Sequence, residues 1–71
     1  MSVTVTSPKS LSEEDIRVLA LLAEGLPLDA VARRLDMSER TLRRRIRAVC
    51  DRLGVSAAIA AVAWAAKRGL L

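Results

Sequence analysis

Four arginines recur at helical spacing in the middle of the chain. Arg40, Arg43, Arg44 and Arg47 stand at positions i, i+3, i+4 and i+7, so a helix over 39–53 carries all four on one side. The guanidinium groups repel one another, and the only neighbouring acid expected to relieve them is Asp51, one turn further on. Guanidinium groups suit phosphates and the edge of guanine. This pattern predicts a face that binds a polyanion, with nucleic acid ahead of a membrane surface or an acidic protein.

The composition excludes several other kinds of chemistry. Histidine is absent and Cys50 is the only cysteine, which rules out a Cys/His zinc site, a histidine-based catalytic triad or dyad, and a haem held by histidine. No set of nucleophile, base and orienting group is available, so an enzyme is not expected. A single aromatic residue, Trp64, argues against a surface that stacks single-stranded bases. We expect no metal, no cofactor and no small-molecule ligand, and a core position for Cys50.

The charge balance agrees with a polyanionic partner. Twelve Lys and Arg residues against eight Asp and Glu give a net charge of +4, and ten of these basic residues are arginines. The charge is segregated: residues 38–53 hold six bases and two acids (+4), whereas residues 11–37 hold three bases and six acids (−3). No apolar run approaches about 18 residues and no signal peptide opens the chain, so we expect a cytoplasmic protein without a membrane partner.

Helix signals follow one another from residue 11 to the end of the chain. Residues 1–10 offer no apolar face and are expected to form a flexible tail before one domain over 11–71. The apolar spacing and the placement of Ser, Pro and Gly predict helices over about 12–24, 27–35, 39–53 and 57–68. Ser12 and Asp15 form a capping box, and Ser38 and Ser56 are the expected caps of the last two helices. The expected fold is all-α with four helices.

The expected helix over 39–53 has a second side, opposite the arginines. Leu42, Ile46, Val49 and Leu53 share it and form a core stripe. A short helix, a tight turn and a longer helix with an outward basic face make up the helix-turn-helix arrangement, in which the second helix enters the major groove of DNA. We therefore interpret the chain as a helix-turn-helix domain whose partner is double-stranded DNA.

Five short motifs occur in an order and spacing that are specific when taken together. They are Leu11-Ser12-Glu13-Glu14-Asp15 with Val18-Leu19, Glu24-Gly25-Leu26, Val31-Ala32-Arg33-Arg34-Leu35, Ser38-Glu39-Arg40-Thr41-Leu42, and Leu53-Gly54-Val55. Together they resemble the C-terminal DNA-binding domain of LuxR-type transcription regulators, over residues 11–71. The resemblance implies a four-helix LuxR-type helix-turn-helix fold, in which the second and third helices form the motif and the fourth forms a homodimer contact.

The resemblance also implies roles for individual residues. Those matching the family's base-facing positions, already placed outward by helical spacing, are Arg43, Arg44 and Arg47. Contacts to the DNA backbone are expected from Ser38, Arg40, Thr41, Arg45 and Arg34. Arg33 and Arg34 have an alternative, because either has Asp29 and Asp36 within reach as ion-pair partners. Asp36 stands where the family has a turn glycine, so it either adopts a left-handed conformation or changes the turn.

The last expected helix has two nearly opposite apolar faces. Ile59, Val62, Ala66 and Leu70 form one, and Ala57, Ala60, Ala61 and Trp64 form the other. A domain this small cannot bury both, so the second face predicts a homodimer interface. The alternative is that Trp64 covers the loop before the first helix and the alanines merely favour helix.

A second class of function shares this composition. A small helical adaptor of the transcription machinery would use the same arginine face to bind an acidic protein, for example a subunit of RNA polymerase. The two functions differ in their binding to duplex DNA, which an adaptor would bind little at physiological salt, whereas a DNA-binding domain would lose affinity steeply as salt rises.

Overall fold

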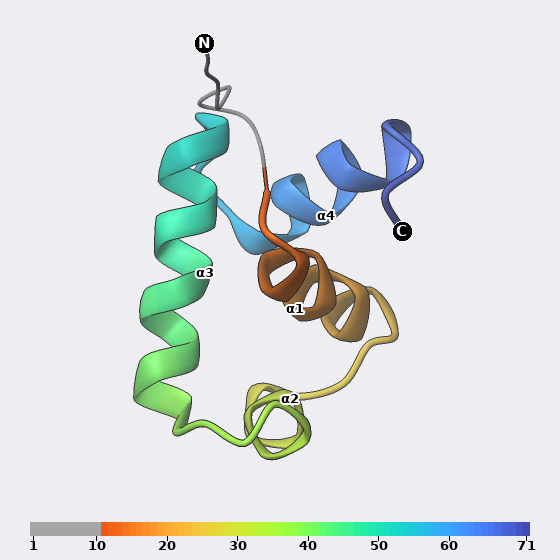
Figure 1. Ribbon diagram of the computed structural model, residues 1–71. Coiled ribbons are helices and arrows are strands. Elements are labelled where there is room, and N and C mark those ends of the chain that lie inside the picture. Colours follow the sequence, from red (N-terminus) through yellow and green to blue (C-terminus); the bar gives the residue numbers. More distant parts are fainter. Residues whose placement is uncertain (1–10) are drawn as a thin grey trace, which may run out of the picture.

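The computed structural model describes residues 11–71, so the expected tail over 1–10 lies outside the described residues. Four helices follow one another: α1 (Glu13–Ala23), α2 (Leu28–Arg34), α3 (Glu39–Leu53) and α4 (Ala58–Lys67). No strand occurs among the described residues. Figure 1 shows α3 along one side of the molecule and the other three helices beside it. The predicted all-α fold with four helices is confirmed, and each helix end lies within one residue of its expected position.

Local signals explain most of the helix ends. The Asp15 amide N–H donates to Ser12 Oγ (3.1 Å) and the Ser12 N–H donates to the Asp15 carboxylate (3.3 Å), which is the predicted capping box. At the start of α3 the Thr41 N–H donates to Ser38 Oγ over 3.1 Å, also as predicted. The prediction for α4 is wrong: its N-cap is Ala57, which has no side-chain acceptor, and not Ser56. The first turn of α4 is therefore uncapped.

The turn between α2 and α3 depends on a left-handed residue. Asp36 has φ 59°, and the next amide, that of Met37, donates to the Ala32 carbonyl over 2.9 Å. The pattern closes α2 and turns the chain directly into the Ser38 cap. Of the two alternatives for Asp36, the structure has the left-handed one.

Replacing Asp36 by glycine is expected to stabilise the domain by about 0.5–1 kcal/mol, because glycine adopts positive φ without the penalty that an L-residue pays. The midpoint of urea unfolding, measured at a constant m-value, checks this. Asp36→Ala is the matched variant and should destabilise, because alanine has neither glycine's freedom nor the tolerance of aspartate for this region. A lower midpoint for the glycine variant would show that the aspartate side chain stabilises the turn.

The core consists of two clusters that α3 connects. One packs α1, α3 and α4 together and contains Leu19, Val49, Cys50, Leu53, Ala61 and Ala65. The other packs α1 and α2 against the first half of α3 and contains Val18, Val31, Ala32 and Leu42. Ile46 is half-buried and packs against both clusters. The predicted core stripe of α3 is confirmed, and so is the core position of Cys50.

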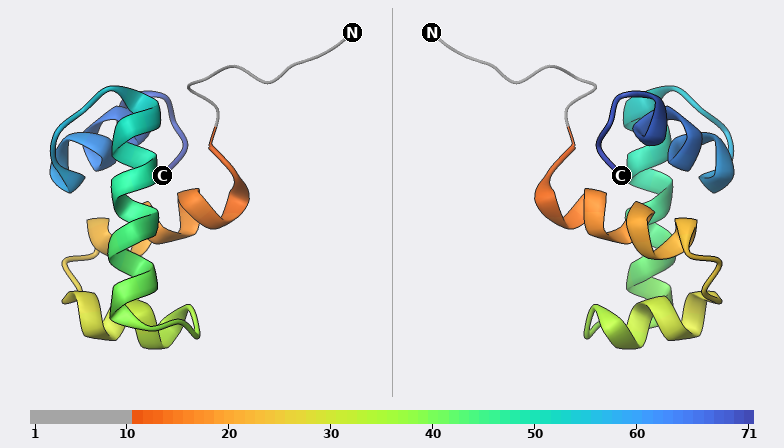
Figure 2. Two further views of the ribbon diagram at one scale, coloured as in Figure 1. Left: turned by 90° about the vertical axis from the view of Figure 1, so that its left-hand side faces the viewer. Right: turned by 90° about the vertical axis from the view of Figure 1, so that its right-hand side faces the viewer.

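The arrangement of the four described helices leaves one long side of α3 uncovered. The left view of Figure 2 looks at this side, and α3 stands in front of the other helices along its whole length. The chain bends by 57° between α3 and α4, which brings α4 back against α1. Among the described residues, each helix taken singly is too short or too polar to cross a membrane.

Candidate nucleic-acid interface

The uncovered side of α3 carries three arginines that have no ion-pair partner among residues 11–71. Arg40, Arg44 and Arg47 are all exposed, and every ion pair of the described residues involves other groups. We call these three residues the outward strip. Helical geometry places them within one narrow sector, opposite the buried Leu42 and Val49. The strip is a concentration of positive charge that no acid of residues 11–71 pairs with.

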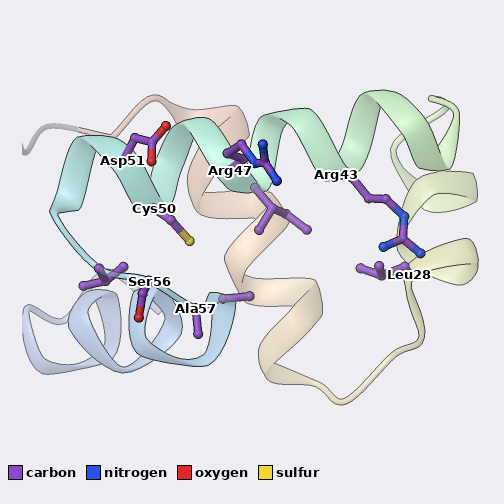
Figure 3. Close-up of a pocket in the computed structure, with 10 residues that line it drawn as sticks. Leu28, Arg43, Arg47, Cys50, Asp51, Ser56 and Ala57 are labelled. Carbon is purple, nitrogen blue, oxygen red and sulfur yellow. The ribbon is translucent and has the colours of Figure 1, made fainter.

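Arg43 differs from the strip in its surroundings. Its Nη2 atom lies 3.4 Å from Glu39 Oε1, so the expectation that Asp51 is the only neighbouring acid is wrong. Arg43 and Arg47 border an open groove of about 630 Å³ between α2, α3 and the start of α4. In Figure 3 the Arg43 guanidinium points across this groove toward Leu28 of α2. Exposed i,i+4 pairs contribute only a few tenths of a kcal/mol, so a ligand can replace Glu39 at little cost.

Arg45 is turned toward α1 and away from the outward strip. Its Nη1 atom lies 3.0 Å from Glu14 Oε1 and 3.8 Å from Asp15 Oδ1, and its buried Nε has no hydrogen-bond partner in the described part of the chain. The expected contact of Arg45 with the DNA backbone stays a prediction, and in the free protein its guanidinium pairs with α1. The physical reason is the 100° step between Arg44 and Arg45, which moves Arg45 from the uncovered side to the flank that meets α1.

A buried carboxylate fixes this flank. Asp15 is only 4% exposed and accepts from the Arg52 guanidinium over 2.8 Å, in addition to closing the capping box of α1. The pair joins α1 to the last turn of α3, 37 residues apart in the chain. Sequence reasoning identified Asp15 as a cap but missed Arg52, because no local pattern links the two. This ion pair adds a polar contact between α1 and α3 to the apolar packing of the two core clusters.

The start of α3 presents two hydroxyl groups to solvent. Ser38 Oγ accepts from the Thr41 N–H and donates to Thr41 Oγ1 over 3.0 Å, and both residues are exposed. Because the Ser38 hydrogen is used in this way, the Thr41 hydroxyl hydrogen is free to donate outward. Arg34 is exposed and forms no ion pair among residues 11–71. The Arg33 Nη2 atom lies 3.5 Å from Asp29 Oδ2, so Arg33 forms one of the ion pairs expected as its alternative.

Cys50 also lines the groove that Arg43 and Arg47 border, and it is nearly buried. It is 7% exposed and free, and burial together with the charge of Asp51 raises the pKa of its thiol above the ordinary value of 9.0. The thiol is therefore protonated at neutral pH and a poor nucleophile. This agrees with a packing role for the residue.

The two faces expected on α4 are wrong in part: Val62 packs on the core cluster and Ala57 is exposed, as expected, but other residues lie elsewhere. Ala61 is fully buried and therefore cannot contact a partner. Trp64 is half-buried and packs on the same core cluster as Leu11. Arg68 covers its ring, with the guanidinium Cζ 4.0 Å from the ring centroid. Ile59, expected among the core-facing residues, is 79% exposed. Small residues face the core here because α4 approaches α1 and α3 closely. The exposed apolar residues on the opposite side are Ile59, Ala63 and Ala66, which we call the α4 outer face.

The comparisons with known proteins agree with this architecture. The transcriptional regulatory protein YdfI of Bacillus subtilis (strain 168) is 36% identical over 61 residues, a match that covers 86% of this chain and 29% of the relative. The chain therefore spans less than a third of the length of that relative. No solved structure matches the chain. A model of the homeodomain-like domain matches residues 14–53, which is more than half of the chain and takes in α2, α3 and nearly all of α1. The chain belongs to the homeodomain-like helix-turn-helix family.

Proposed function

We propose that this domain binds double-stranded DNA in a sequence-specific manner, with α3 in the major groove. The observation that carries the proposal is the outward strip: Arg40, Arg44 and Arg47 project together from a helix that no other element of residues 11–71 covers on that side. Guanidinium groups without an internal partner gain most from a polyanion, because their pairing does not require an existing ion pair to break. The short α2 and the tight turn before α3 support the helix-turn-helix mode of docking.

The proposed contacts fall into two groups. Arg43, Arg44 and Arg47 read base edges, where guanine O6 and N7 offer the two acceptors that one guanidinium matches. Ser38, Thr41, Arg40 and Arg34 hold phosphates around the start of α3, where free helix N–H groups add to the attraction. Arg45 contacts a phosphate only after its ion pair with Glu14 breaks. We therefore expect it to contribute the least to DNA affinity among the residues that contact the DNA backbone.

The biological role that we propose is transcription regulation. The relative that covers most of this chain is named a transcriptional regulatory protein, and the five motifs of residues 11–71 resemble LuxR-type domains in the order of their occurrence. A transcription regulator needs a domain that binds particular DNA sites, and a base-reading helix on a small domain provides this. RNA polymerase is a further partner that we propose for such a regulator, and it would bind outside the α3 surface that DNA occupies.

Selection of binding sites from random duplex DNA tests the function, and a salt titration of the selected site completes the test. About six phosphate contacts predict that log K falls with log salt with a slope of about −5. A helical adaptor would enrich no sequence and would show little duplex binding at physiological salt. That outcome would replace the DNA-binding function by the protein-binding alternative.

We further propose that the domain binds DNA as a homodimer through the α4 outer face. Ile59 is 79% exposed at one end of this face, and Ala63 and Ala66 continue it at helical spacing, so two copies can bring their α4 helices close together. The two-fold axis would then require inverted half-sites about 34 Å, or one DNA turn, apart.

Replacing Ile59 by Glu is expected to abolish dimer formation, because two carboxylates would meet at the symmetry axis. Binding to an inverted repeat should lose its cooperativity, while binding to a single half-site stays within about twofold. Sedimentation at high protein concentration measures the first effect. The unfolding midpoint is the control, since a side chain this exposed contributes little to folding. A wild-type chain that sediments as a monomer with and without DNA would contradict the dimer.

A further inference from the structure

The outer side of α3 ends in a carboxylate. Asp51 is exposed and stands four residues after Arg47 and seven after Arg44, so helical geometry aligns it with the outward strip. No ion pair joins it to any basic group of residues 11–71, although Arg47 is one turn away. In Figure 3 its carboxylate points away from α4, near the opposite end of α3 from Arg43.

In the free protein this carboxylate can only reduce the repulsion among the arginines through space, because it forms no ion pair with them. It lies in the last turn of α3, where the negative end of the helix dipole disfavours an acid. Its side chain also makes no hydrogen bond within the described residues. A residue that breaks a local rule without a compensating contact is a candidate for a role toward a ligand. In the proposed function, the ligand that faces this side of α3 is DNA.

We propose that Asp51 is a specificity-determining residue that acts by repulsion, because it disfavours non-specific DNA more than the specific site. The inference rests on the proposed function. Non-specific binding draws nearly all its energy from phosphates, so the whole outer side of α3 lies against the backbone and brings Asp51 to a phosphate. A carboxylate beside a phosphate is repelled, which opposes the attraction of the outward strip. This repulsion lowers the affinity for non-specific DNA relative to the affinity for the specific site.

The specific complex exposes Asp51 to less repulsion for a geometric reason. In helix-turn-helix docking the first turns of the recognition helix contact the base edges. Arg47 is the last of the proposed base-reading arginines, and Asp51 lies four residues further, which is about 6 Å along the helix axis. A helix whose first turns read the bases therefore keeps Asp51 beyond the bases that the arginines contact.

Asp51→Asn tests this with two duplexes of equal length, one carrying the selected site and one without it. We expect affinity for the non-specific duplex to rise about threefold at low salt, with a salt slope steeper by up to about 0.9. Affinity for the selected site should change by less than about twofold. The ratio of the two affinities, which measures specificity, should therefore fall.

Glu24→Gln is the matched control, because it makes the same change in net charge at an exposed position. Residue 24 directly follows α1, whose end lies far from α3 in Figure 1. This variant should change both affinities equally and little. An equal rise on both duplexes for Asp51→Asn would overturn the inference. So would a loss of affinity for the selected site with a changed preference at one base pair, since Asp51 would then accept from a base amine. If the wild-type chain bound neither duplex, the proposed function itself would fail.

Discussion

Replacing Arg44 by alanine is expected to reduce affinity for the selected DNA site by about 1–3 kcal/mol, or roughly 5- to 150-fold. Arg44 lies in the outward strip, exposed and without an ion-pair partner among residues 11–71, so its guanidinium is available to match guanine O6 and N7. The loss should be confined to one base pair, whose identity becomes irrelevant to binding of the variant. Titration of a set of duplexes with single substitutions measures this.

The comparison with Arg40→Ala separates the two kinds of contact. Arg40 is assigned to a phosphate, so its removal should weaken binding to all sequences alike and make the salt slope shallower by about one. Arg44→Lys adds a second control, because lysine keeps the charge and lacks the planar pair of donors. If Arg44→Ala lowers affinity for every duplex equally, Arg44 contacts the backbone and our assignment is wrong.

Replacing Asp15 by alanine is expected to destabilise the domain by about 2–4 kcal/mol. The substitution removes the acceptor of the Ser12 N–H, the 2.8 Å partner of Arg52 and the second acid beside Arg45. We place the loss below the full cost of breaking a buried pair, because the Arg52 side chain is 41% exposed and water can replace part of the interaction. For a chain of 71 residues this approaches half of the total stability. Urea unfolding measures it.

Two variants distinguish the sources of this loss. Asp15→Asn keeps an oxygen that can accept from the Ser12 N–H and from Arg52 but loses the charge. The difference between Asn and Ala therefore reports these hydrogen bonds, and the remainder reports the charge of the ion pair. Asp29→Ala removes only the exposed pair with Arg33 and should cost a few tenths of a kcal/mol. If Asp15→Ala costs no more than Asp29→Ala, the carboxylate does not hold α1 against α3.

Local patterns predict the elements of this domain well. The Ser12 capping box, the Ser38 cap and the glycines after α1, α3 and α4 set helix ends, because each acts on backbone groups within a few residues. The outward side of α3 was also predictable. Its charged and apolar residues are segregated around the helix, so burying any side other than that of Leu42 would bury arginines.

The same reasoning fails where local patterns leave a choice. Nine of the ten residues of α4 are apolar, so burial of several faces has a similar energy and the sequence does not select one. The fold places Ala61 and Ala65 inward, because small side chains allow α4 to pack closely on α1 and α3, and leaves Ile59 outside.

Ion pairs between segments that are distant in the sequence could not be predicted from local patterns either. Arg45 and Arg52 resemble the other arginines of α3 in sequence, yet Glu14 and Asp15 hold them. The sequence alone thus determined the helices and the basic side of α3, since those follow from the helical repeat and from capping. Only the tertiary structure decided which arginines remain free, because Coulomb attraction depends on distances between α1 and α3 that no local pattern contains.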